Sequence, residues 1–192
     1  ERSYHIFYQL LAASDALKEE IWDGLIGTDN ESFVYVGYTD TVKIEGKTDA
    51  ERFQITLDAL AIVGVKGDTL RDLMRSLCIV LQLGNLRFEQ DPENEENAII
   101  TSIEELETLS ELMGVDNEIV KKALTERTVT ARNEVFKVPL NLEKAQDSCN
   151  AFAKEIYSNS FDWLVKTINY ATCAENNYEN PKADFGLIGL LD

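Results

Sequence analysis

The stretch "NLEKAQDSCNAFAKEIYSNSFDWLVKTINYATC", residues 141–173, decides the fold because it is one long, unbroken helical pattern. Its apolar side chains form two stripes at helical spacing, one of Cys149, Phe152, Ile156, Trp163 and Ile168 and a second of Phe161, Val165 and Thr172. Two apolar stripes predict that the C-terminal half of this helix is buried between layers. The chain is therefore expected to be mainly α, as an α+β fragment.

Shorter helical patterns precede the long one, and most begin at a residue that can cap a helix. The expected starts are at Ser14 or Asp15, Thr48 or Asp49, Ser102 (in a capping-box-like sequence) and Asp116, while a further helix covers Tyr4 to Leu11. Gly114 is a predicted helix stop. The pattern from Leu70 to Gly84 carries apolar side chains beyond one stripe, which predicts a central helix.

Four regions of the sequence have strand-like patterns. "NLRFEQ" and "AIITS" are predicted as short strands joined by the acidic segment "DPENEEN", which is expected to be a solvated loop. Residues 127–140 are predicted to form an exposed, hairpin-like loop, and residues 27–49 an ordered loop with one small strand. The apolar run 185–192 reads as a buried strand whose sheet partners lie elsewhere, so a chain cut there is expected to self-associate through it.

Composition excludes several classes of partner and site. The net charge is −17, from 35 acidic and 18 basic residues, which argues against nucleic acid and anionic membranes. No apolar run is long enough to cross a membrane, so no direct membrane insertion is expected. The three cysteines, Cys78, Cys149 and Cys173, are widely spaced in apolar helical patterns and are expected to be reduced core thiols. His5 is interpreted as a hydrogen-bonded structural histidine, with a catalytic role as the alternative.

The chain carries no motif that would hold a phosphate or a metal. It lacks a glycine-rich phosphate loop, and it has neither CxxC nor HExxH spacing, so no direct metal ligand is predicted. Arg127, Arg132 and Lys137 cluster beside Glu126 and Glu134 in the hairpin-like loop. Such a loop either keeps the protein soluble or docks a partner on a rigid scaffold. From the pattern alone, two alternatives are a free-standing helical protein-interaction domain and a small hydrolase that uses its carboxylates, and the second lacks a glycine-lined phosphate or metal site.

Five strings in this chain resemble the myosin motor domain in the family's order. "ERSYHIFYQLL" resembles the segment after switch I, "LQLGNLRFE" is similar to "LHLGN(I/V)xF", and "ALTERTVTARNEVFKVPLNLEKA" resembles the actin-facing cardiomyopathy loop. "NAFAKEIYSNSFDWLVKTIN" is similar to "DALAKxIYxxLFxWLVxxIN", and "FGLIGLLD" resembles the strand that opens switch II. The resemblance spans residues 1–192 and implies the helical upper 50 kDa subdomain of a P-loop motor, with 185–192 in the central transducer sheet.

The resemblance also implies a function for the whole parent protein. It would be an ATP-driven, cytoplasmic, cytoskeleton-associated motor that binds Mg-ATP and the actin filament, with the present chain bound to the rest of the motor domain. The chain alone is expected neither to bind nor to hydrolyse ATP, because the phosphate-cradling parts lie outside it. Asp192 would start switch II near Mg-ATP in the intact motor.

The resemblance places an actin-binding surface on the cardiomyopathy-type loop, and the residues implied are Arg127, Thr128, Thr130, Arg132, Glu134 and Lys137. Glu134 lies sixteen residues before Asn150, where many motors carry a phosphorylatable Ser or Thr, so it resembles the constitutively acidic form of that position. The family's "DALAK" is "NAFAK" here. Asn150 and Phe152 are interpreted as a packing change with no functional meaning.

Overall fold

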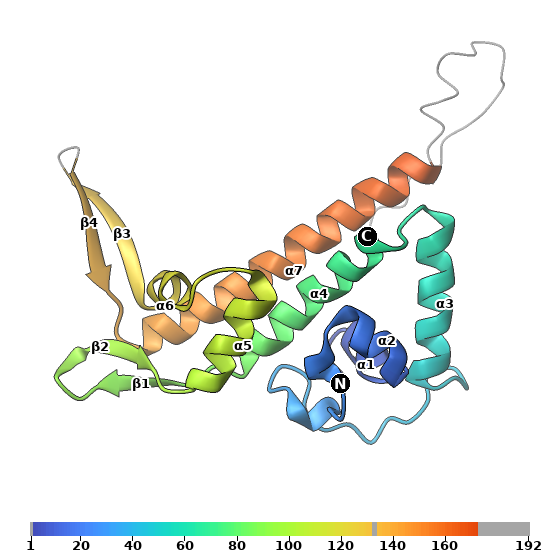
Figure 1. Cartoon of the computed structure of the whole chain (residues 1–192), viewed down its shortest axis with the longest axis horizontal. Helices are drawn as coiled ribbons and strands as arrows, with labels where there is room; N and C mark the ends of the chain where they lie inside the picture. The colour runs from blue at the N-terminus through green and yellow to red at the C-terminus, as the bar shows by residue number, and fades with distance from the viewer. Residues whose placement is uncertain (1, 132–133, 173–192) are drawn as a thin grey trace, which may run out of the picture.

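Two helices form the axis of the molecule. The computed structural model describes residues 2–131 and 134–172, in which α4 (Asp68–Gly84) and α7 (Leu142–Thr172) pack against each other and run in opposite directions (Figure 1). The long helix predicted over 141–173 is thus confirmed, since α7 begins one residue later and runs to the last described residue, Thr172. Cys173, Asp192 and the predicted strand 185–192 lie outside the described residues.

The central position predicted for α4 is confirmed. Its buried side chains lie on more than one face, and they are Met74, Leu77, Cys78, Val80, Leu81, Gln82 and Leu83. On α7 the buried residues are the small Ala145, Cys149 and Ala153. Small side chains let the two helix backbones approach closely, and the Cys149 Sγ donates a hydrogen bond to the Leu83 carbonyl at 3.4 Å. The part of α7 that contributes to the core is therefore its N-terminal half.

The C-terminal half of α7 is exposed, so the prediction that it is buried between layers is wrong for the described residues. Phe161 is 54% exposed and Trp163 is 40% exposed, and Val165 and Ile168 are also classed as exposed. Only the side toward α4 is covered, where Leu164 packs against the core and the Ser160 Oγ lies 3.0 Å from the Ser76 Oγ. The physical reason is that a periodic pattern identifies an apolar face but not the layer that covers it.

The N-terminal third packs on α4 as a group of short elements (Figure 1). These are α1 (His5–Leu11), α2 (Asp15–Ile21), η1 (Asp23–Leu25), η2 (Asn30–Ser32) and α3 (Asp49–Ile62). The predicted caps are confirmed, because the Ser14 side chain accepts from the Leu17 N–H and Thr48 forms a capping box with Glu51. Between residues 27 and 49 the expected small strand is reduced to one isolated bridge, Ile44 to Lys47.

Two further helices, α5 (Ile103–Met113) and α6 (Asn117–Thr125), cover the other end of the axis. Gly114 ends α5 in the left-handed conformation, with φ of 67°, as predicted. The Asp116 side chain caps α6 by accepting from the Glu118 N–H. The capping box predicted at Ser102 is wrong, because its hydroxyl oxygen instead accepts a hydrogen bond from the Arg87 N–H at 2.9 Å.

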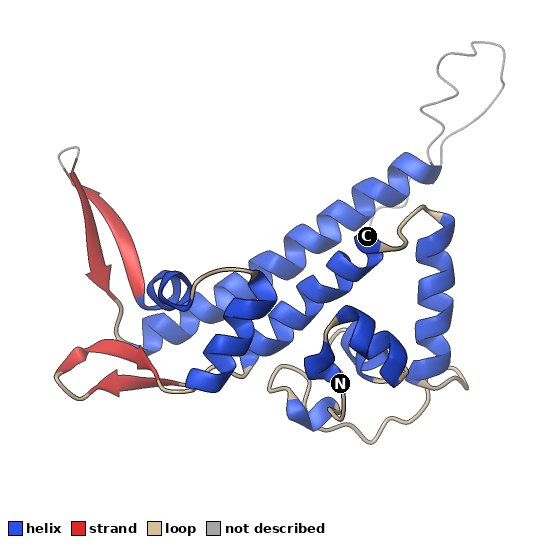
Figure 2. Ribbon diagram, viewed as in Figure 1, coloured by secondary structure: helices blue, strands red, loops and turns tan. Residues whose placement is uncertain are grey.

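Two antiparallel hairpins extend from this same end of the molecule (Figure 2). The first consists of β1 (Phe88–Asp91) and β2 (Asn94–Ile100), and the second consists of β3 (Glu126–Ala131) and β4 (Glu134–Pro139). The first hairpin confirms the strands predicted at "NLRFEQ" and "AIITS", and the second confirms the hairpin-like loop predicted over 127–140. The acidic segment "DPENEEN", predicted as a loop, is partly strand. β2 begins within it at Asn94, and Ala98 of β2 pairs with Gln90 of β1.

The chemically distinctive side chains of the described region lie in ordinary surroundings. Cys78 and Cys149 are free and buried, as predicted, and burial raises the pKa of their thiols to about 12 and about 11. His5 is exposed and has no hydrogen-bond partner among the described residues, so the prediction of a hydrogen-bonded structural histidine is not confirmed. None of the described helices combines the length and the apolar character that a membrane crossing requires.

Candidate functional site

The hairpin of β3 and β4 projects from one end of the described structure, and β4 is exposed along most of its length (Figure 2). Its strands pair without a register shift, from Glu126 opposite Pro139 to Ala131 opposite Glu134. Residues directly opposite each other in an antiparallel pair point to the same face, and successive residues alternate between faces. The register therefore assigns every side chain of the hairpin to one of two faces.

The predicted actin-binding residues divide between these two faces. Thr128 pairs with Lys137, and Thr130 pairs with Val135, so all four lie on one face. The opposite face carries Arg127, Val129, Phe136 and Glu134. Arg132 lies outside the described residues. The sequence analysis predicted one charged cluster in this loop. The strand register instead places Glu134 and Lys137 on opposite faces.

The charged side chains of the hairpin are available to a partner. Arg127, Glu134 and Lys137 are exposed, and none of them forms an ion pair with another described residue. Phe136 is 47% exposed and Val135 is 66% exposed, so each face also carries an apolar side chain. Apolar side chains with unpaired charges around them are the composition of an interface with a polar rim.

The base of the hairpin is held firmly by Leu140. This residue is buried, its N–H donates to the Thr125 carbonyl at 2.8 Å, and its carbonyl accepts from the Ala98 N–H at 2.8 Å. One residue thereby joins the end of α6, the first hairpin and the second. Immediately afterwards the Asn141 side chain accepts from the Lys144 N–H at 3.0 Å, which caps the start of α7. The base of the hairpin is thus anchored directly before the start of the long helix.

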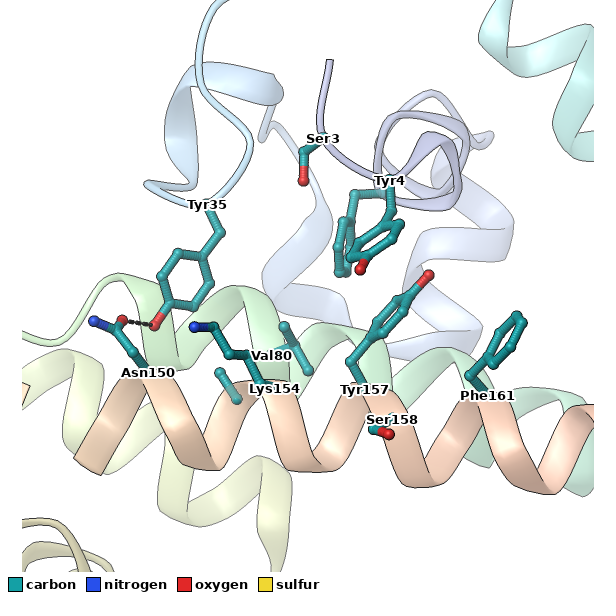
Figure 3. A pocket seen from close by; sticks show the side chains of 11 residues that line it. Ser3, Tyr4, Tyr35, Val80, Asn150, Lys154, Tyr157, Ser158 and Phe161 are labelled. Atoms are coloured by element: carbon teal, nitrogen blue, oxygen red, sulfur yellow. Dashed lines mark hydrogen bonds between the residues drawn. The ribbon is translucent and has the colours of Figure 1, made fainter. Parts of the chain in front are cut away.

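A second surface feature is a groove between α1, the loop around Tyr35, α4 and α7 (Figure 3). Its volume is about 730 Å³, and it is lined by Ser3, Tyr4, Phe7, Tyr35, Val80, Asn150, Ala153, Lys154, Tyr157, Ser158 and Phe161. At one end the Tyr4 and Tyr157 rings stack with centroids 4.3 Å apart. At the other end the Tyr35 hydroxyl donates to the Asn150 Oδ1 at 2.6 Å.

The Tyr35 contact gives Asn150 a structural partner, which agrees with its interpretation as a packing change. Asn150 holds the loop that carries Tyr35 against α7. The Tyr35 ring lies over Gly84 of α4, where an added Cβ would come within 2.7 Å of the ring. Sequence reasoning missed this contact, since Tyr35 and Asn150 are 115 residues apart. The available signal was Gly84, a glycine inside a helical pattern, which often marks a close approach.

The segment that enters α1 is fixed by an ion pair. The Arg2 Nη2 donates to both carboxylate oxygens of Asp49, at 2.8 and 2.9 Å, and the guanidinium lies 3.8 Å from the centroid of the Tyr8 ring. The Tyr8 hydroxyl in turn accepts from the Ser3 N–H at 3.3 Å and donates to the Val36 carbonyl at 3.2 Å. These contacts place Tyr4 at the edge of the groove.

The phenol of Tyr35 provides a pH test of this arrangement. Burial, with a smaller contribution from Cys149, raises the pKa of Tyr35 to about 12 from 10.0. Because the folded state holds this proton more tightly, the stabilisation is fully present below pH 10 and is lost as the pH rises toward 12. We expect an absorbance titration of the tyrosines to show a step near pH 12 that Tyr35→Phe removes. An unchanged titration curve in Tyr35→Phe would contradict the burial of this phenol.

The described residues do not gather the ligands of a metal site. Within residues 2–131 and 134–172, no group of three or more His, Cys, Asp or Glu side chains could hold a metal ion. The hairpin offers exposed charges, and the groove offers aromatic rings with one cation.

Comparison with known proteins gives a consistent result over the whole chain. The model of the family described as "Myosin head (motor domain)" matches residues 1–192. The chain is 34% identical to unconventional myosin-Ic of Danio rerio, over 100% of the chain and 18% of that protein. It is 34% identical to myosin-1 of Coprinopsis cinerea, over 100% of the chain and 15% of that protein. It is 35% identical to myosin-52 of Schizosaccharomyces pombe, over 100% of the chain and 12% of that protein. The chain thus spans less than a fifth of the length of these relatives.

Proposed function

This chain belongs to the myosin head (motor domain) family, and we propose that it forms the upper 50 kDa subdomain of an ATP-driven, actin-based motor. In this role the hairpin of β3 and β4 contributes to the actin-binding surface, and the helices form a wall of the cleft that divides the motor's actin-binding region. The parent protein would associate with the cytoskeleton. The remainder of the motor domain is the constant partner of this chain.

The observation that carries the proposal is the way the hairpin is presented. It is exposed along β4, its charges have no ion-pair partners among the described residues, and Leu140 fixes its base to α6 and to the first hairpin. An anchored base reduces the conformational entropy that the hairpin loses when it docks, so more of its contact energy is available for binding. Because α7 begins directly after the hairpin, a change in the hairpin's position would be passed to the long helix.

Mg-ATP would be bound by other parts of the parent protein, where it supplies the free energy for movement. The described residues of this chain offer no triad of acidic or imidazole ligands for Mg²⁺. Asp192 is the residue of this chain that would lie near the nucleotide, where it would contact Mg²⁺ through a bound water. The described residues would instead transmit the state of the nucleotide site to the hairpin.

Glu134→Ala in the parent motor is expected to weaken actin activation of ATP turnover. Glu134 lies on the face that also presents Arg127 and Phe136, and its carboxylate is exposed. Exposed charges at the rim of an interface contribute about 1 kcal/mol or less and act mainly on the association rate. We therefore expect a reduction of up to about fivefold, together with a changed dependence of actin affinity on salt. The melting temperature should stay nearly constant.

Two variants serve as controls for this measurement. Glu107→Ala removes an exposed carboxylate from the middle of α5 and should leave actin activation unchanged. Lys137→Ala removes a charge from the opposite face of the hairpin, so comparing it with Glu134→Ala shows which face contacts actin. If Glu134→Ala leaves actin activation intact and lowers the melting temperature, the hairpin is a structural element and the assignment is wrong.

A further inference from the structure

The groove in Figure 3 has an apolar floor between two aromatic walls. Val80 and Ala153 belong to the floor, and both are buried. Tyr35 stands at one wall, and the stacked rings of Tyr4 and Tyr157 stand at the other. A volume of about 730 Å³ lies within the range of about 300–1,000 Å³ that small-molecule sites occupy. The space between the walls suits a flat apolar group.

The polar groups of the groove favour an anion. Lys154 supplies the one charged side chain in the lining, and its amine extends over the floor toward Tyr35 and Asn150 (Figure 3). No described carboxylate pairs with Lys154. At the same end the Tyr35 hydroxyl donates to the Asn150 Oδ1, and the Asn150 amide nitrogen points away from Lys154 (Figure 3). Lys154 is exposed at the mouth of the groove, where its ammonium can meet an incoming anion.

We infer that this groove binds a small planar aromatic anion, with its ring between the tyrosine walls and its acidic group on Lys154. The ligand is expected to be aromatic because aromatic rings stack on the faces of tyrosine side chains. A carboxylate or sulfonate accepts a charge-assisted hydrogen bond from an ammonium group, which accounts for its charge. The inference does not depend on the proposed actin-binding role of the hairpin, because the two surfaces share none of their lining residues.

The test uses 2-naphthoate as the probe and 2-naphthylmethanol as its neutral counterpart, with binding to the 192-residue chain measured by titration calorimetry. Naphthoate should bind saturably with a Kd below about 1 mM. Lys154→Gln should weaken naphthoate about fivefold and leave naphthylmethanol unchanged, because only the anion uses the ammonium. Tyr4→Ala should weaken both probes, and Tyr4 is exposed enough for this change to leave the fold intact. The matched control, Lys137→Gln on the hairpin, should alter neither.

Three results would overturn the inference. One is the absence of saturable naphthoate binding, and another is an equal effect of Lys154→Gln and Lys137→Gln. The third is naphthoate binding by the 192-residue chain that disappears in the intact parent motor, since a neighbouring part of the parent would then occupy the groove. Persistence of binding in the parent, with the same loss in Lys154→Gln, would support the inference.

Discussion

Leu81→Ala is expected to lower the free energy of unfolding by about 2–5 kcal/mol, the usual cost of truncating a leucine in a packed core. Leu81 is 0% exposed and lies on α4, which packs against α7, α5 and α2. The cost combines the lost apolar contacts with the cavity that remains, because the two axial helices are already joined through small side chains and can move little closer. Urea unfolding followed by circular dichroism measures the change.

Ile62→Ala is the matched control for this prediction. Ile62 is also a large aliphatic side chain on a helix, but it is 85% exposed at the end of α3. Its truncation should change the free energy of unfolding by no more than about 0.5 kcal/mol. Similar losses in the two variants would mean that α4 is not the centre of the core.

Local signals were sufficient to predict most of the elements. The long helix was predicted over 141–173 and is observed as Leu142–Thr172, because helical periodicity and the capping Asn141 are properties of adjacent residues. The hairpin predicted within 127–140 is observed as β3 and β4 for the same reason.

Contacts between distant residues could not be predicted in this way. The exposed half of α7 shows that an apolar stripe does not specify what covers it. Ser102 shows that a residue able to cap a helix can form another hydrogen bond instead, since its hydroxyl oxygen accepts from the Arg87 N–H. The groove depends on rings from three separate segments that only the tertiary fold brings together. Both candidate surfaces therefore needed the structure to define their faces.

Gly84→Ala is expected to destabilise the chain by about 1–3 kcal/mol through overpacking. Gly84 is the last residue of α4, and an added Cβ would lie 2.7 Å from the Cδ2 and 2.8 Å from the Cγ of Tyr35. Carbon atoms do not approach so closely, so the ring would have to move. The bond from the Tyr35 hydroxyl to Asn150, at 2.6 Å, holds the far end of the ring and opposes that movement.

The same substitution should have the opposite effect when the ring is absent. In a Tyr35→Ala background the added Cβ meets no ring, and alanine is favoured over glycine in a helix by up to about 1 kcal/mol. Gly84→Ala should then be neutral or stabilising, so the double-mutant cycle isolates the contact between Gly84 and Tyr35. Urea unfolding of the four proteins measures it. A loss of equal size in both backgrounds would show that Gly84 is required for the end of α4 itself, and that the Tyr35 ring does not pack on it.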